Sequence, residues 1–252
     1  MSPVWFISHG APDLVLRDEP ATRFMKDLSL GPLKGLVVIS AHWFSRELEI
    51  NSAHNPALMY DFHGFPDALY RGRWPASSPA WLQQAVQETL LQGGLVANPV
   101  LRELDHGVWS PLSLLDANSE IPLVQISIPA GMSPAELWRL GEALAPLRQQ
   151  GIGILASGAI THNLRALGPD GSPPPAWAQA FAHWLEEKMD KQDKAALLDY
   201  RDQAPGAVQS HPHDDHLRPL FVALGAAGAD KPLRLHDSWD YGSLYMGSYR
   251  FG

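Results

Sequence analysis

The stretch Leu36-Val37-Val38-Ile39-Ser40-Ala41-His42-Trp43 shows the pattern on which the fold depends. Its four apolar, largely β-branched residues predict a buried strand, and a serine and a histidine follow the run closely. Val4–His9 (VWFISH) has the same pattern, and Gly151–His162 repeats it with a longer interval between the serine and the histidine. Three separate strands are therefore expected to end close to a histidine.

Short apolar runs like these alternate along the chain with longer segments of helical period. Strands are expected at Val4–Ile7, Leu36–Ile39, Leu123–Ile128 and Gly151–Ala156. Ser133, with Pro134 and Glu136 after it, has the pattern of a capping box and predicts a helix that ends near Gly151. Further elements are expected as helices from Ser78 to Gly94, after Pro175, and from Asp214 or Asp215 to Gly225, and as a terminal strand or hairpin from Leu233 to Phe251. This alternation predicts an α/β fold.

The length and the loops favour one domain over residues 1–252. The most linker-like loop, Gly168–Pro175, precedes a predicted helix with Trp177, Phe181 and Trp184 on one face, and that apolar face needs a partner. The chain has 252 residues, 45% hydrophobic and 18% charged, which is typical of a globular protein with a sizeable core.

Charge and cysteine content exclude several classes of function. The 19 Lys and Arg against 27 Asp and Glu give a formal net charge of −8, so no positive field is available to bind nucleic acid or an anionic membrane. The absence of cysteine excludes disulfides and thiolate ligands, so any metal must be bound by His, Asp or Glu. The N-terminus lacks the pattern of a signal peptide and no apolar run could span a bilayer, so we expect a cytoplasmic protein without a membrane partner.

The histidines are the candidate functional residues. In open α/β sheets ligands bind outside the carboxyl ends of the strands, where His9, His42 and His162 are expected to gather. Imidazole is the commonest neutral metal ligand, so three of them predict a metal site. Two more are candidates: His106 and His216, the latter in the first turn of the helix expected from Asp214 or Asp215. His106 is expected in a loop, where Gly107 permits close approach of the backbone to a ligand and Asp105 can orient the ring by a hydrogen bond. The others are interpreted as structural or surface residues (His54, His63, His183, His236) or as members of a polar loop (His211, His213).

Motifs that would indicate other chemistry are missing. The sequence has no Gly-x-Gly-x-x-Gly turn, no phosphate loop ending in Gly-Lys-Ser/Thr, no Gly-x-Ser-x-Gly elbow and no His-Glu-x-x-His helix. These absences argue against a dinucleotide-binding enzyme, a P-loop nucleotidase, an α/β-hydrolase and the usual zinc protease.

Six short motifs occur in order along nearly the whole chain: Ser8–Pro12 (SHGAP), Ser40–Trp43 (SAHW), Asp61–Pro66 (DFHGFP), Asp105–Trp109 (DHGVW), Ser157–Leu164 (SGAITHNL) and His216 ahead of Pro219-Leu220. Together they resemble the class III extradiol ring-cleavage dioxygenases, a LigB-like family, and within it the branch similar to DOPA 4,5-dioxygenase. The resemblance implies a three-layer α/β/α sandwich with one mixed central sheet.

The same resemblance implies roles for the histidines. His9, His42 and His216 match the metal ligands of this branch. His216 is the third ligand, which in other ring-cleaving relatives is a glutamate. His162 matches a histidine that is either a direct ligand or lies one shell out and serves in acid/base catalysis, and His106 matches the other acid/base residue. The implied cofactor is one divalent metal ion per chain, Fe²⁺ for dioxygenase activity or Zn²⁺, and the implied substrates are a small aromatic diol such as DOPA and O₂.

Two alternatives to ring cleavage remain open from the residues alone. Three imidazoles and a bound water would also suit a zinc-dependent hydrolase. A non-catalytic metal-binding protein would equally collect imidazoles. The sequence does not indicate which catechol is the natural substrate, which metal is native, or the oligomeric state.

Overall fold

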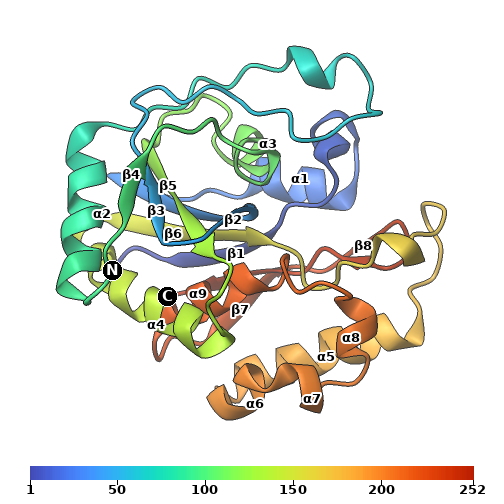
Figure 1. Cartoon of the computed structure of the whole chain (residues 1–252). Coiled ribbons are helices and arrows are strands. Elements are labelled where there is room, and N and C mark those ends of the chain that lie inside the picture. The colour runs from blue at the N-terminus through green and yellow to red at the C-terminus, as the bar shows by residue number, and fades with distance from the viewer.

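Four parallel strands form the centre of an eight-stranded mixed sheet (Figure 1). In order across the sheet they are β5 (Leu123–Pro129), β2 (Gly35–Ser45), β6 (Ile152–Gly158) and β1 (Val4–Ser8). The antiparallel strand β10 (Ser248–Phe251) and then β7 (Pro232–His236) extend the sheet beyond β1, and β3 (Glu49–Asn51) and β4 (Asn98–Val100) extend it beyond β5. This computed structural model describes residues 1–252, and all four strands expected from the sequence are present.

Helices cover both faces of the sheet. On one face lie α2 (Ala80–Gln92), α4 (Pro134–Leu144) and α9 (Arg218–Ala227), and on the other α1 (Pro20–Asp27) and α3 (His106–Leu115). Beside α9, near the small β8–β9 hairpin (Trp239–Asp240 and Leu244–Tyr245), lie α5 (Ala176–Asp190), α6 (Lys194–Leu198), α7 (Tyr200–Gln203) and α8 (Ala207–Ser210). The three-layer α/β/α sandwich is thus confirmed. None of these helices has the length and apolar character to cross a membrane.

Because helices cover both faces of the sheet, the central strands are apolar along their whole length. In β2, Val37 and Ile39 pack into the core under α2, α4 and α9, whereas Leu36 and Val38 pack into the core under α1 and α3. All four side chains are at most 1% exposed. Neighbouring residues of a strand point to opposite faces, so a strand buried on both sides cannot alternate between apolar and polar residues.

The helix predicted from Ser133 forms with its capping box. The side chain of Ser133 accepts from the main-chain N–H of Glu136, and the Glu136 carboxylate accepts from the main-chain N–H of Ser133 at 2.7 Å. After Leu144 the chain tightens into a 3-10 helix (Ala145–Gln150), and Gly151 ends it with a φ of 85°. Glycine adopts this left-handed conformation without a steric penalty, which explains the predicted stop.

Two expected boundaries were wrong, and each lies close to a candidate functional histidine. β2 continues to Ser45 instead of ending at Ile39, so His42 lies inside the strand. Its register against β5 shifts between Ile39 and Phe44, an irregularity that redirects side chains. The helix α9 begins at Arg218, so His216 lies in the turn before it and not in its first turn.

Two glycines allow α4 and α9 to pack backbone to backbone. A Cβ atom on Gly225 would lie 2.0 Å from the carbonyl oxygen of Trp138, and one on Gly141 would lie 2.1 Å from the carbonyl oxygen of Val222. Neither oxygen belongs to a flexible side chain, so a methyl group could fit only if the helices moved apart.

We therefore expect Gly225→Ala to lower the free energy of unfolding by about 2–3 kcal/mol, the usual cost of overpacking a core. An unobstructed Gly→Ala change in a helix would instead stabilise it. The control is Gly131→Ala, where a Cβ would meet nothing within 4 Å. Urea unfolding of both variants and the wild type measures the difference, and equal midpoints for the two variants would contradict the close packing.

Candidate metal centre and active site

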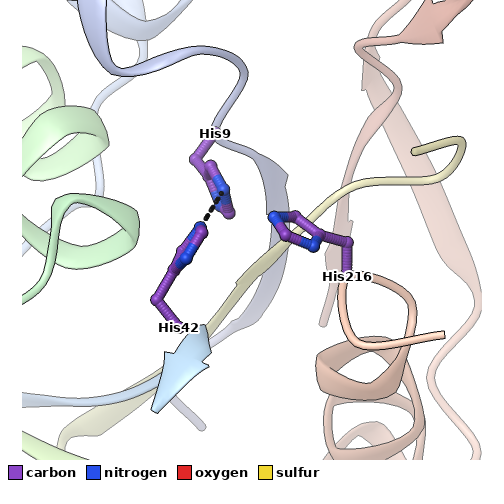
Figure 2. Close-up of side chains that lie close together, drawn as sticks. All are labelled: His9, His42 and His216. Carbon is purple, nitrogen blue, oxygen red and sulfur yellow. Dashed lines mark hydrogen bonds between the residues drawn. The ribbon is translucent and has the colours of Figure 1, made fainter. Parts of the chain in front are cut away.

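Three histidines from distant parts of the chain meet beyond the carboxyl ends of the central strands (Figure 2). His9 directly follows β1, His42 lies near the end of β2, and His216 lies in the turn before α9. One ring nitrogen of each lies within 4.8 Å of the other two, and the Nε2 atoms of His9 and His42 are 3.2 Å apart. The structure thus brings together three of the histidines singled out in the sequence.

A buried network fixes the position of His42. The main-chain N–H of His42 donates to Oγ of Ser40 at 3.1 Å, and that hydroxyl donates to Oδ1 of Asp105 at 2.6 Å. The other oxygen of Asp105 accepts from Nε2 of Gln125 at 2.6 Å. Asp105 is fully buried, and this burial raises the pKa of its carboxyl group. The carboxyl group of Asp105 therefore holds the end of β2 in place.

Hydrogen bonds also determine which nitrogen of His9 carries its proton. Nδ1 of His9 lies 2.9 Å from Oγ of Ser157, and the same hydroxyl donates its hydrogen to the carbonyl oxygen of Gly107. A hydroxyl has one hydrogen, so Ser157 can only accept from His9. The proton of the neutral ring is then on Nδ1, and the lone pair of Nε2 is free.

The ring of His216 is fixed in the same way. Its Nδ1 lies 3.0 Å from Oδ1 of Asp215, and its main-chain N–H donates to that oxygen at 2.8 Å. A carboxylate can only accept, so Nδ1 carries the proton and Nε2 keeps its lone pair. Metal-binding histidines typically show this arrangement, in which the second nitrogen donates to a neighbouring oxygen.

The surroundings keep these imidazoles neutral. Burial, followed by repulsion from the other histidines, lowers the pKa of His9 and of His216 well below the usual value. Burial, together with repulsion from His106, lowers the pKa of His42 to about 3. Neutral imidazole is the form that coordinates a metal, because protonation removes the lone pair.

The three side chains therefore fit a divalent metal ion in donor type, protonation and spacing. Two nitrogens bound to one ion at about 2.1 Å with a tetrahedral angle would lie roughly 3.4 Å apart. The Nε2 atoms of His9 and His42 are 3.2 Å apart, and that of His9 has its lone pair available.

His106 lies against this group and is held by a carboxylate that the sequence analysis did not single out. Its ring centroid is 4.0 Å from that of His42. Its Nδ1 lies 2.9 Å from Oδ1 of Asp61, which also accepts the main-chain N–H of His106 at 3.1 Å. The hydrogen bond and the charge of His106 outweigh the effect of burial and lower the pKa of Asp61. In the neutral form of the ring the proton is therefore on Nδ1, with Nε2 free to accept a proton.

Two expectations about His106 were wrong. It is the first residue of α3 and not part of a loop, and Asp61 orients its ring, since Asp105 is bound to Ser40 and Gln125. Gly107 is needed because a Cβ there would lie 2.4 Å from Oγ of Ser40. The glycine thus allows α3 to approach β2, whereas close approach to a ligand was expected.

His162 follows β6 and stacks on His216. The two ring centroids are 3.5 Å apart with an angle of 8° between the ring planes. His162 joins His216 and Asp215 in a second group of close ligand atoms, which shares His216 with the three histidines described above. Burial lowers the pKa of His162.

These five histidines line one end of a cavity of about 610 Å³. Its other walls are mostly apolar, and the aromatic side chains among them are Phe62, Phe65, Tyr241 and Tyr245. This volume is within the range of small-molecule binding sites. The cavity therefore offers a histidine-rich end and an apolar body, which suit an aromatic ring.

The remaining histidines lie away from this cavity. His211 is buried and its Nε2 lies 2.7 Å from the carbonyl oxygen of Ile160, while His236 stacks on Phe24. His54, His63, His183 and His213 are exposed. Of the aromatic residues in the motifs, Phe65 lines the cavity, whereas Trp109 is only 3% exposed and belongs to the core.

The sequence analysis missed the three residues that set the protonation of the histidines, namely Asp61, Ser157 and Asp215. Asp61 begins a motif that was quoted without a role, and Ser157 and Asp215 were treated only as neighbours of histidines. The available signal was the recurrence of a serine or an aspartate close to each candidate histidine.

Comparisons with known proteins agree with this geometry. Residues 19–252 match the family model described as the catalytic LigB subunit of aromatic ring-opening dioxygenase. A 4,5-DOPA dioxygenase extradiol from Beta vulgaris is 37% identical over 98% of this chain and 95% of its own length. A protein of the same name from Escherichia coli (strain K12) is 34% identical over 99% of this chain and 94% of its own.

A solved structure shows the same fold over the full length. The crystal structure of the uncharacterized protein JW3007 from Escherichia coli K12 superimposes with a TM-score of 0.84 at 31% identity and covers 100% of both chains. The chain described here therefore belongs to the LigB family of aromatic ring-opening dioxygenases. It is a metal-dependent oxidoreductase of the extradiol type, as the motifs of the sequence had indicated.

Proposed function

We propose that residues 1–252 act as one catalytic domain that cleaves the ring of a substituted catechol, such as DOPA, with O₂ and one bound Fe²⁺ ion. The observation that carries the proposal is the meeting of His9, His42 and His216 at the end of an apolar cavity, with His106 and His162 beside them. An aromatic diol would place its ring in the apolar body and its two hydroxyl groups toward the histidines.

His9, His42 and His216 would hold the ion through their Nε2 atoms, because the Nδ1 atoms of His9 and His216 donate to Ser157 and Asp215. Ferrous iron, when bound, would supply the electron transfer between a diol and dioxygen that lie side by side. An all-histidine ligand set also suits zinc, but zinc lacks this redox chemistry.

The proposed reaction needs no external reductant. The carbon–carbon bond next to the diol breaks, and both atoms of O₂ enter the product, one in an aldehyde and one in a carboxylate. The diol must lose protons as it binds, and one oxygen must be protonated later. A histidine with a free nitrogen can perform either transfer.

We assign these transfers to His106 and His162. Nε2 of His106 is free because Nδ1 donates to Asp61, so this nitrogen would take a proton from a substrate hydroxyl. His162, stacked on His216 at the cavity wall, would hold or return a proton on the other side of the substrate. The apolar walls around them would limit the access of water to the reacting ring.

The first test is oxygen consumption by protein reconstituted with Fe²⁺ under anaerobic conditions. With a panel of substituted catechols we expect a yellow ring-opened semialdehyde as the product. One O₂ should be consumed for each catechol molecule, since extradiol cleavage consumes the two in equal amounts. Zinc-loaded protein is the control and should consume none. Ester or amide hydrolysis by zinc-loaded protein, without oxygen uptake by the iron form, would support the hydrolase alternative instead.

Metal content tests the ligand assignment independently of turnover. His9→Ala and His42→Ala should each reduce the bound metal from about one ion per chain to near zero, because a site of three neutral donors loses most of its affinity with one of them. His183→Ala is the matched control, since His183 is an exposed histidine on α5. Full metal retention by either of the first two variants would refute the assignment.

His106 should behave as an acid/base residue, not as a ligand. We expect His106→Ala to retain about one ion per chain and to lower turnover by about 10²–10⁴, the usual contribution of positioned proton transfer. Asp61→Asn should lower turnover by a similar factor, because an amide can donate to Nδ1 and so move the ring proton to Nε2.

The double variant distinguishes this role from a general disturbance of the site. If Asp61 acts through His106, adding Asp61→Asn to His106→Ala should change turnover little further. Asp67→Asn, an exposed aspartate of the same loop, is the control and should match the wild type. Loss of metal in His106→Ala would show that His106 is a ligand, and additive losses would exclude action through one residue.

A further inference from the structure

The walls of the cavity beyond the histidines have an unbalanced charge. The lining includes the aromatic residues Phe62, Phe65, Tyr241 and Tyr245 and the aliphatic residues Leu164, Leu167, Leu244 and Met246, but only one carboxylate, Asp215, and no lysine or arginine. A negatively charged substituent on the substrate ring would therefore meet no permanent positive charge on these walls. A positively charged substituent would meet one carboxylate and several aromatic rings, whose faces attract cations.

Asp215 has an oxygen available for such a contact. Its Oδ1 accepts from the main-chain N–H and from Nδ1 of His216, whereas Oδ2 accepts no hydrogen bond. The side chain is 41% exposed and lines the cavity. The carboxylate can therefore orient His216 with one oxygen and accept from an ammonium group with the other.

The arginines around the cavity are engaged or point elsewhere. Arg17 lies behind the ring of Tyr241, 4.8 Å from its centroid, and its Nη1 donates to Asp240 at 3.0 Å. Its side chain is only 16% exposed. Arg102 donates to the carbonyl oxygen of His42 and packs over Trp43. Arg165 is exposed and does not line the cavity.

From these contacts we infer that the cavity selects catechols by the charge of the ring substituent. It favours substituents that carry an ammonium group, accepts uncharged ones, and disfavours substituents that carry only a carboxylate. An amino acid side chain such as that of DOPA belongs to the favoured class, because its ammonium group can contact Asp215 while its carboxylate points toward solvent. The inference rests on the proposed function in taking a catechol as the ligand.

Binding to zinc-loaded protein tests this selection without turnover. Three ligands share a catechol ring and a two-carbon linker: 4-(2-aminoethyl)catechol, 4-ethylcatechol and 3-(3,4-dihydroxyphenyl)propanoate. We expect the aminoethyl compound to bind most tightly and the propanoate about tenfold more weakly than it. A partly exposed ion pair contributes up to about fivefold, and the propanoate both lacks this attraction and is repelled by Asp215. Isothermal titration calorimetry measures the three affinities.

Two variants test the residues named. Asp215→Asn should reduce the ratio of the affinity for the aminoethyl compound to that for the ethyl compound toward one. The uncharged ethyl compound is the reference for any effect of the substitution on His216. Leu164→Arg should strengthen binding of the propanoate about fivefold or more, by placing a cation at a wall position that is 62% exposed. Leu91→Arg is the control, because Leu91 is 63% exposed on α2 and does not line the cavity.

The outcomes separate this inference from the proposed function. Binding in the expected order, with no oxygen consumed by the iron-loaded protein, would overturn the dioxygenase proposal and leave charge selection supported. Turnover of catechols together with propanoate binding as tight as aminoethyl binding would overturn charge selection alone. Failure of all three compounds to bind would overturn it as well, as would an unchanged preference in Asp215→Asn.

Discussion

The hydroxyl group of Ser157 makes the contact on which the geometry of the active site depends. It donates to the carbonyl oxygen of Gly107, at the start of α3, and accepts from Nδ1 of His9, directly after β1. The side chain of Ser157, at the end of β6, thereby joins the residue that follows β1 to the first turn of α3. Because Gly107 has no Cβ, α3 also packs directly against Ser40 of β2. These contacts place His106 beside His42, so the proposed acid/base residue is fixed relative to the proposed ligands by the same groups that fix the ligands.

The concentration of imidazoles imposes an electrostatic constraint. Five histidines share one end of the cavity, and adding a proton to any of them would place a charge among the others in a largely buried space. Burial and mutual repulsion lower the pKa values of His9, His42 and His216, and the carboxylates of Asp61 and Asp215 contact Nδ1 of His106 and of His216 from the outer side. The lone pairs of Nε2 are therefore directed inward, away from the nearest negative charges. Such an arrangement favours a divalent cation over protons, which is the property a metal site requires at neutral pH.

The sequence predicted the parts of this site that depend on local periodicity. The apolar runs that end before His9 and His42 mark strands because both faces of the sheet are covered, and the rule that parallel strands present their carboxyl ends at one edge brings these histidines together. The capping box of Ser133 could be predicted because its two hydrogen bonds lie within one helical turn. The position of His42 within β2 was not predicted, because the shift in register depends on pairing with β5, which is far away in the sequence. The partnership of Asp61 with His106 was missed for the same reason, since these residues meet only when the loop after β3 folds over α3.

The two ends of the cavity differ in how they are built. The histidine end is formed by residues at the ends of buried strands and at the starts of α3 and α9. The residues that hold these histidines in place, such as Ser40 and Asp105, are buried. The opposite walls come from loops and from the β8–β9 hairpin, where Leu164 is 62% exposed and Tyr241 has a φ of 47°. A substitution at the histidine end must disturb a packed and hydrogen-bonded core, whereas one at the loop end changes mainly the surface that a ring substituent contacts. The fold therefore separates the proposed metal ligands and acid/base residues from the residues proposed to contact the ring substituent, so that the preference for a substrate could change while the histidine end stays intact.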